Sequence, residues 1–419
     1  MRSRSGGVAR RRPIVVAIAA LLAVAAVAVV VHRVLAPAEV LTTARTGYPA
    51  PVNAATGVVG TLASAPLIVD GRLRVYATTR QVRADLPVDA RTRRTPYWSY
   101  RRWPAELIGV VASGTTVVSR WSDGNLVALD ARTGRIVWRV DGPPPGHGYN
   151  GRRTGASTNY TPAGLIPATG RSGRAVLVVI GGSGVRGLDL ADGRELWRVG
   201  IDGSCRAGAL TTSGGQLVTV DACAAPQVAE FHDVESGELV DRWRPEDAGP
   251  ELGLAPLGCG NGGSNCPAMR TSSAGTTRGW LVDRDEPVPV PVLDPTEAVL
   301  DGDVALTPSG RELVARSVRD GSELWRRTGR EPARIVAVQS GRVHLLTDAH
   351  ELVTLNSMTG AERSSFPLTA GDEVVAWRPG FAYAADGFVA VERLASAAPP
   401  DADDQQFYGA AQPVILAAT

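Results

Sequence analysis

Residues 126–138 read LVALDARTGRIVW, and this pattern of an apolar strand, an acidic turn with glycine and a strand ending in tryptophan recurs along the chain. Each copy is typical of a β-hairpin, because apolar residues alternate along both arms and Asp, Ser and Thr side chains can bond the amides of the turn. The other copies lie at 185–197, 313–325 and 352–363, with weaker ones at 82–98 and 228–243 and a degenerate hairpin at 280–292.

The turn glycines give the period of the repeat. They are Gly134, Gly193, Gly237, Gly321 and Gly360, and they are separated by 59, 44, 84 and 39 residues. Each can adopt the positive φ that closes a tight turn. The separation of 84 residues covers two steps across the degenerate copy, and a step of about 42 residues suits a four-stranded blade.

One tryptophan per blade is predicted to pack between neighbouring blades. These residues are Trp138, Trp197, Trp243 and Trp325. An indole buries a large apolar area and offers one N–H donor, which needs a partner when it is buried. We therefore assign these side chains to the core and not to a cofactor site.

The blades are expected to stack around an axis, since a four-stranded sheet with two apolar faces cannot bury both alone. Seven hairpins lie between residues 82 and 363, and strands at 373–377, 381–385 and 388–394 belong to an eighth blade. Its missing last strand is expected from the N-terminal segment near 52–62, with 412–417 as the competing donor. The predicted fold is all-β, an eight-bladed β-propeller with seven blades as the alternative.

The Leu-Asp-x-x-Thr-Gly-x-x-x-Trp turn at 129–138, present in altered form at 188–197, resembles the pyrroloquinoline-quinone (PQQ) type repeat of quinoprotein-like propellers. The resemblance covers residues 55–395 and implies the fold. The family includes quinoprotein dehydrogenases and non-catalytic relatives similar to the propeller lipoprotein of the outer-membrane barrel assembly machine. The resemblance implies that the dehydrogenases of the family are longer than this chain and carry a disulfide between two adjacent cysteines. No two cysteines are adjacent in this sequence. We expect the non-catalytic branch, with no cofactor and no metal, and a PQQ-dependent or other small-molecule-processing enzyme is the alternative.

Residues 14–31 form an uninterrupted apolar stretch, IVVAIAALLAVAAVAVVV. Eighteen helical residues span about 27 Å, which is close to the hydrocarbon thickness of a bilayer. Five arginines precede the stretch and one directly follows its end, which favours a cytoplasmic N-terminus and an extracytoplasmic propeller. A cleaved signal peptide is the alternative. The predicted organisation is a basic tail (1–12), a transmembrane signal anchor (13–36), a linker (37–54), the propeller (55–395) and a C-terminal tail (396–419).

Four cysteines predict two local disulfides, Cys205 with Cys223 and Cys259 with Cys266. An even number of cysteines fits an oxidising compartment. The spacings of 18, 36 and 7 residues do not match the two close pairs of a zinc site. The cysteines therefore favour a protein that is exported from the cytoplasm.

The step from Gly134 to Gly193 exceeds the blade period by about 17 residues. The excess lies at 143–162, PPPGHGYNGRRTGASTNYTP, and long polar loops on a rigid scaffold often carry recognition. The candidate binding residues of this loop are His147, Tyr149, Arg152, Arg153 and Tyr160. The loop between Cys259 and Cys266 is a second candidate, because a disulfide would order its backbone before binding. An unconstrained insertion is the alternative for the first loop.

Charge argues against nucleic acid as a partner. The formal charge is +2, but six arginines precede the first acidic residue, Glu39, so the rest of the chain carries −4. Nucleic-acid binders need a concentrated basic face. The expected partners are the membrane, through residues 14–31, and an envelope protein or cell-wall component. The predicted function is an extracytoplasmic binding scaffold.

Overall fold

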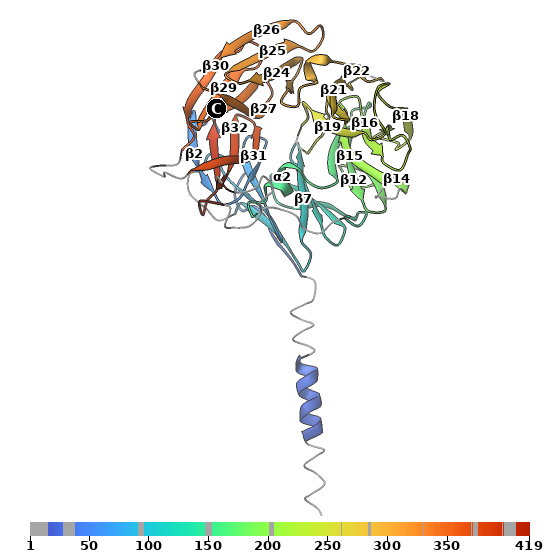
Figure 1. Cartoon of the computed structure of the whole chain (residues 1–419). Coiled ribbons are helices and arrows are strands. Elements are labelled where there is room, and N and C mark those ends of the chain that lie inside the picture. Colours follow the sequence, from blue (N-terminus) through green and yellow to red (C-terminus); the bar gives the residue numbers. More distant parts are fainter. Residues whose placement is uncertain are drawn as a thin grey trace, which may run out of the picture.

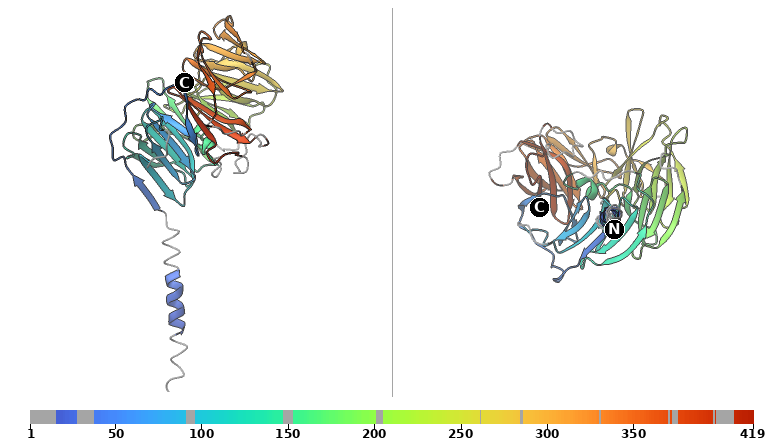
Figure 2. Two further views of the ribbon diagram at one scale, coloured as in Figure 1. Left: turned by 90° about the vertical axis from the view of Figure 1, so that its left-hand side faces the viewer. Right: turned by 90° about the horizontal axis from the view of Figure 1, so that it is seen from below.

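Eight antiparallel sheets stand around a central axis in the computed structural model, which confirms the predicted all-β propeller with eight blades (Figure 1 and Figure 2). The structure describes residues 16–27, 38–90, 96–146, 153–200, 205–260, 262–283, 286–329, 331–369, 371, 376–395, 397 and 408–419. We number the blades 1 to 8 in chain order.

The first four blades have the following strands. Blade 1 contains β3 (Pro66–Val69), β4 (Leu73–Thr78), β5 (Gln81–Asp85) and β6 (Trp98–Trp103), and blade 2 contains β7 (Leu107–Ser113), β8 (Thr116–Trp121), β9 (Asn125–Asp130) and β10 (Ile136–Asp141). Blade 3 contains β11 (Leu165–Thr169), β12 (Ala175–Gly181), β13 (Gly184–Asp189) and β14 (Glu195–Gly200), and blade 4 contains β15 (Arg206–Thr211), β16 (Gln216–Asp221), β17 (Val228–Asp233) and β18 (Leu239–Trp243).

The next three blades follow the same order. Blade 5 contains β19 (Gly253–Leu257), β20 (Ala268–Ser273), β21 (Thr276–Leu281) and the two-residue β22 (Val288–Pro289), followed by the 3-10 helix η2 (Pro291–Leu293). Blade 6 contains β23 (Val299–Asp301), β24 (Val304–Ser309), β25 (Glu312–Ser317) and β26 (Glu323–Thr328), and blade 7 contains β27 (Ala333–Gln339), β28 (Arg342–Thr347), β29 (Glu351–Asn356) and β30 (Glu362–Pro367). In all seven blades the predicted hairpins are the third and fourth strands.

Blade 8 joins the two ends of the chain. It contains β31 (Trp377–Ala385), β32 (Phe388–Ala395), β33 (Val414–Ala418) and, as the outermost strand, β2 (Gly57–Leu62). Both candidate donors are therefore used, because β33 pairs with β32 and β2 pairs with β33. The two strands expected at 373–377 and 381–385 are instead one bulged strand, β31.

Two segments that the sequence placed outside the propeller contribute strands to it. The expected C-terminal tail, 396–419, supplies β33, and the expected linker, 37–54, contains β1 (Ala38–Thr42). Strand β1 pairs antiparallel with β6 and gives blade 1 a fifth strand, whose residues are all exposed. Both segments are strands because their backbones pair with neighbouring strands. Neither segment carries the repeat pattern, so the sequence did not indicate them as part of a blade.

Four indoles pack between blades in one common arrangement. The Nε1–H of Trp98, Trp138, Trp197 and Trp325 donates to a backbone carbonyl of the next blade at 2.7–2.9 Å. A Cβ on the turn glycine of that next blade would lie only 2.4–2.7 Å from the indole-bearing side chain, so a larger residue would displace the tryptophan. The indole and the glycine turn together form the contact that the repeat encodes.

Trp243 does not follow this arrangement. It lies two residues beyond the equivalent position of β18, where Asp241 pairs with Phe231. Its ring packs edge-on against Trp280 of blade 5, with 4.7 Å between ring centroids. The next blade has no glycine turn to receive it, and Gly321 of blade 6 instead faces Val292, with 3.7 Å between Val292 Cγ1 and the position of a Cβ.

A helix at 16–27 lies within the predicted membrane span, and all its side chains are exposed. The remaining residues of that span, 14–15 and 28–31, lie outside the described residues. Among the described helices none has the length and apolar character required to cross a bilayer.

Candidate functional site

The long connection between blades 2 and 3 turns back to the axis of the ring, where α2 (Ala156–Tyr160) lies (Figure 1). This helix contacts β3, β4, β7 and β31. Gly155 precedes it with φ of 72°, and a Cβ there would lie 2.2 Å from the carbonyl oxygen of Ala77. Glycine is therefore required where the chain enters the centre of the ring.

A buried arginine holds the base of this connection. Arg120 of β8 is 1% exposed and donates to the carbonyl oxygens of Pro143 (3.1 Å) and Gly164 (3.1 Å), at the two ends of the connection. It also donates to Ile180 O at 2.7 Å. Burial lowers the pKa of Arg120 to about 10. Sequence analysis did not select Arg120, because its role depends on contacts across two blades.

Tyr160, the last residue of α2, is largely buried near the centre of the ring. Its ring stacks on Tyr383, with 4.8 Å between centroids and 14° between planes, and its hydroxyl donates to Pro66 O at 2.9 Å. Burial, followed by the nearby Tyr383 and Glu392, raises the pKa of Tyr160 well above its usual value. Tyr160 is therefore largely buried, and it also lines the cavities at the centre of the ring. Its role as a candidate binding residue stays a prediction.

Arg153 and Thr154 attach the same connection to blade 8. The Thr154 hydroxyl donates to Glu392 Oε1 at 2.7 Å, and the Tyr408 hydroxyl donates to the same oxygen at 2.9 Å. The Arg153 guanidinium lies 4.4 Å from the centre of the Tyr408 ring and donates to Ala410 O. The other predicted residues of this loop, His147, Tyr149 and Arg152, lie outside the described residues.

Both predicted disulfides are present, Cys205–Cys223 and Cys259–Cys266. The loop closed by the second leaves blade 5 and lies against blades 3 and 4. The Cys266 amide donates to Thr211 O at 2.7 Å, and the Thr169 amide donates to Asn265 Oδ1 at 2.9 Å. The disulfide therefore holds a short loop across two neighbouring blades.

The two candidate loops meet around a central chamber. It consists of adjoining cavities of about 410 and 860 Å³. The residues that line both cavities are Tyr160, Thr161, Pro256, Gly262 and Gly263. Each of the two cavities alone is in the size range of ligand-binding sites. That the two loops bind a partner or ligand stays a prediction.

The described lining of the chamber offers few charges. Arg206 donates to Thr219 Oγ1 and, at 3.2 Å, to Glu230 Oε2. Burial lowers the pKa of Arg206, and the Glu230 carboxylate opposes this effect. Arg342 donates to the carbonyl oxygen of Thr419, and burial also lowers its pKa. Both guanidinium groups are thus bonded within the protein. The third charged side chain of the described lining, Asp386, accepts a hydrogen bond from the Gly71 amide at 2.7 Å, and the remaining lining is largely glycine and apolar.

No group of three or more His, Cys, Asp or Glu side chains that could hold a metal ion occurs in the part of the chain that the structure describes. The fold is a β-propeller built from PQQ-type repeats.

The chain belongs to the family described as outer membrane protein assembly factor BamB, whose model matches residues 40–140 and 122–339. No curated protein matches the chain. Among solved structures it is similar to BamB from Moraxella catarrhalis, with 14% identity, a TM-score of 0.45 and coverage of 91% of this chain and 99% of that chain.

Two further solved structures are similar in fold. The computationally designed Ika8 protein has 11% identity and a TM-score of 0.48, covering 86% of this chain and 99% of that chain. The C-terminal WD40 domain of Sif2 has 11% identity and a TM-score of 0.47, covering 87% and 96%.

Proposed function

We propose that this protein is a membrane-anchored, extracytoplasmic scaffold that binds a protein partner of the cell envelope at the central chamber. The observation that carries the proposal is the family match over residues 40–339, since that family is described as an assembly factor for outer membrane proteins. The described lining of the chamber, with its bonded arginines and small residues, agrees with binding.

The two disulfides support an extracytoplasmic location, because disulfides persist in oxidising compartments and are rare in the cytosol. The Cys259–Cys266 bridge also orders the loop that lines the chamber before any partner arrives. Ordering a loop in advance reduces the entropy lost on binding. The disulfide therefore contributes to location and to recognition.

The apolar stretch at 14–31 is the proposed anchor, and it lies close to the propeller in sequence. Six residues, 32–37, separate it from β1. A chain of six residues spans at most about 20 Å. Blade 1 is therefore expected close to the membrane surface, with the partner in the adjacent space.

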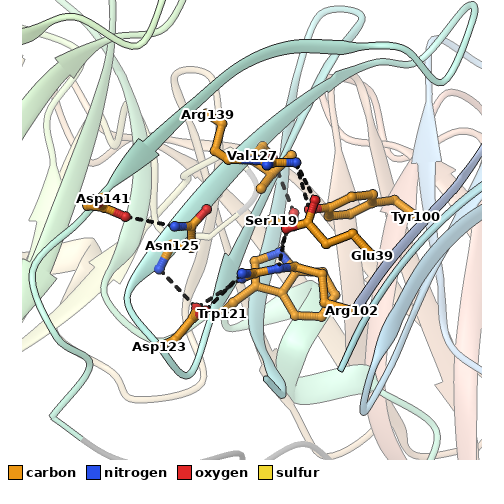
Figure 3. A network of polar contacts seen from close by, with 10 residues as sticks. All are labelled: Glu39, Tyr100, Arg102, Ser119, Trp121, Asp123, Asn125, Val127, Arg139 and Asp141. Atoms are coloured by element: carbon orange, nitrogen blue, oxygen red, sulfur yellow. Dashed lines mark hydrogen bonds and ion pairs between the residues drawn. The ribbon is translucent and has the colours of Figure 1, made fainter. Parts of the chain in front are cut away.

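Side-chain contacts fasten β1 to two blades (Figure 3). Glu39 Oε1 accepts a hydrogen bond from Arg102 Nε of blade 1 at 3.1 Å, and Oε2 accepts one from Arg139 of blade 2 at 2.6 Å. Arg102 also donates to both carboxylate oxygens of Asp123, at 2.9 and 2.8 Å. These contacts support β1 as the firmly held part of the propeller that lies nearest to the proposed anchor in the sequence.

Site-specific photo-crosslinking in cells tests the proposal. A photoreactive residue is placed at Thr161 or Ser340, both exposed at the chamber, or at Arg319 on an exposed turn of blade 6 as a control. We expect crosslinks to one envelope protein from the two chamber positions and none to that protein from position 319. Equal labelling from all three positions, or dye reduction by the purified protein with PQQ and calcium, would contradict the scaffold function.

A further inference from the structure

Charge is divided unevenly between two sides of the propeller. Residues 38–141, which contain β1, blades 1 and 2 and the uncharged β2, carry fourteen arginines and eight Asp or Glu residues, a formal charge of +6. Residues 142–419 carry twenty-four arginines and thirty-four Asp or Glu residues, a formal charge of −10. Three of the fourteen arginines lie within 91–95, outside the described residues. Blades 1 and 2 are neighbours on one side of the ring, and blade 6 lies on the other (Figure 1).

The outer rims of blades 1 and 2 are joined along β1. Glu39 of β1 accepts a hydrogen bond from Arg139 of β10 at 2.6 Å (Figure 3). Further along, the Ala44 amide donates to the carbonyl oxygen of Thr133, in the turn before β10, at 2.9 Å. Residues 39–44 therefore follow residues 133–139, and the two segments form one continuous rim.

Three large apolar side chains of this rim are exposed. Val40 is 57% exposed, Leu41 is 39% exposed and Val137 is 49% exposed. Val40 pairs in register with Arg101 of β6, whose side chain is also exposed. Exposed apolar groups beside arginines are typical of surfaces that bind the membrane interface, because the apolar groups enter the headgroup region while the guanidinium groups contact phosphate.

Four exposed arginines of the rim form no ion pair and no side-chain hydrogen bond with the described residues. They are Arg45, Arg101, Arg132 and Arg135. The carboxylates nearby are already bonded. Glu39 and Asp123 accept hydrogen bonds from Arg102, and Asp130 accepts them from the Arg132 amide and the Thr133 hydroxyl. We call the four arginines, together with the three exposed apolar residues, the rim strip.

We propose that the rim strip docks on an anionic phospholipid surface and thereby turns blades 1 and 2 towards the membrane. The inference rests on the proposed membrane anchor. Residues 32–37 connect the apolar stretch to β1 and span at most about 20 Å, so the anchor limits how far the strip lies from the lipid. The unpaired guanidinium groups can bond lipid phosphates, and the acidic remainder of the propeller is repelled by the same surface.

An acidic segment of a protein offers similar negative charge, but the position of the strip favours the membrane. Val40 lies only two residues after β1 begins at Ala38, and β1 is the first strand after the proposed anchor. The rim strip is thus the part of the propeller that the anchor holds nearest to the lipid. The anchor sets the distance of the propeller from the membrane, and the strip sets which side faces it.

Photo-crosslinking to lipid tests the inference with the full chain in nanodiscs. A photoreactive residue is placed at Thr42, the last residue of β1, or at Thr328, the last residue of β26 in blade 6, and both threonines are exposed. The discs contain phosphatidylcholine alone or mixed with anionic phosphatidylglycerol. We expect stronger lipid labelling from position 42 in the anionic discs, and a decrease with added salt, since salt screens exposed charges. Labelling from position 328 should be weak in both.

Variants of the strip show whether its charge is the cause. Arg101→Gln and Arg135→Gln are each expected to lower lipid labelling from position 42 in anionic discs by up to about fivefold, the effect of one basic residue near an anionic surface. Arg363→Gln is the matched control and should leave the labelling unchanged. It removes an exposed arginine of β30 in blade 7 that also has no carboxylate partner among the described residues. Melting temperatures check that all three variants fold.

Equal labelling from position 42 in the two kinds of disc, or unchanged labelling in both strip variants, would overturn the inference. A protein crosslinked to position 42 in cells, without lipid labelling that depends on phosphatidylglycerol, would assign the strip to an acidic protein partner instead.

Flotation with anionic vesicles separates this inference from the proposed function. If salt releases the bound chain and Arg101→Gln weakens its binding, the proposed anchor fails and the docking surface stands. If the chain stays with the vesicles in salt but position 42 labels no lipid, the anchor stands and the docking surface fails.

Discussion

Replacing Gly237 with alanine should destabilise the protein more than the same change at Gly341, although the two backbones are nearly identical. Their φ angles are +74° and +73°. A side chain in this left-handed region costs about 1–2 kcal/mol at either position. At Gly237 the new Cβ would lie 2.5 Å from Cδ2 of Trp197, whereas nothing lies within 4 Å at Gly341. The indole cannot move aside freely, because its Nε1–H donates to Val234 O at 2.7 Å.

The overlap at Gly237 should add about 1–3 kcal/mol, the usual cost of overpacking a core. We therefore expect a loss of about 1–2 kcal/mol for Gly341→Ala and about 2–5 kcal/mol for Gly237→Ala. Urea denaturation followed by circular dichroism measures both. A matched loss in the two variants would refute the role of the indole in restricting this turn.

A double-mutant cycle isolates the contact. Trp197→Ala alone should cost about 3–5 kcal/mol, because it leaves a cavity where the indole was. In that background Gly237→Ala should cost no more than Gly341→Ala does in the parent protein. Strict additivity would show that the two residues are energetically independent, contrary to the structure.

Three further predictions follow from separate features. Replacing Cys205 and Cys223, which are 18 residues apart, with serine should cost about 3 kcal/mol, and replacing Cys259 and Cys266, 7 residues apart, about 2 kcal/mol, measured by thermal unfolding. The reverse order would contradict a loop-closure explanation. Burial, with a smaller effect of Arg342, lowers the pKa of His344 from 6.5 to about 3, so the unfolded chain binds this proton first and stability should fall as the pH drops from about 6.5 towards 3. His344→Asn should flatten this slope by up to about 1.4 kcal/mol per pH unit, and an identical slope in both proteins would exclude His344 as the cause. Glu39→Ala should lower the global stability by less than about 1 kcal/mol, because the ion pairs are partly exposed, while hydrogen exchange at 38–42 becomes faster. Unchanged exchange there would mean that backbone pairing with β6 holds β1 without its side chains.

The hairpins could be predicted from the sequence because their two strands are neighbours in the chain. In β9 and β10, for example, five residues from 131 to 135 form the turn and the apolar alternation continues on both sides. Blade 8 could be predicted only in outline, since its strands come from residues 57–62 and 377–418. No local pattern indicates which distant strand takes which place, and only the pairing of β33 with both β2 and β32 decides it.

The sequence indicated the connection at 143–162 but not the environment of its residues. The length of the 143–162 segment indicated a connection whose described part lines the chamber, but composition does not distinguish a buried tyrosine from an exposed one. Tyr160 looks like a contact residue in the sequence and is buried in the structure.

The construction of blade 8 has a consequence for biogenesis. Strand β2 ends at Leu62, and the strand that it pairs with, β33, begins at Val414, so β33 is synthesised long after β2. Blade 8 can therefore form only after residues 414–418 have been synthesised, and until then β2 has an open edge. A premature stop that removes 414–418 would leave β2 and β32 without their shared neighbour, so truncated products would carry exposed edges that proteases can recognise.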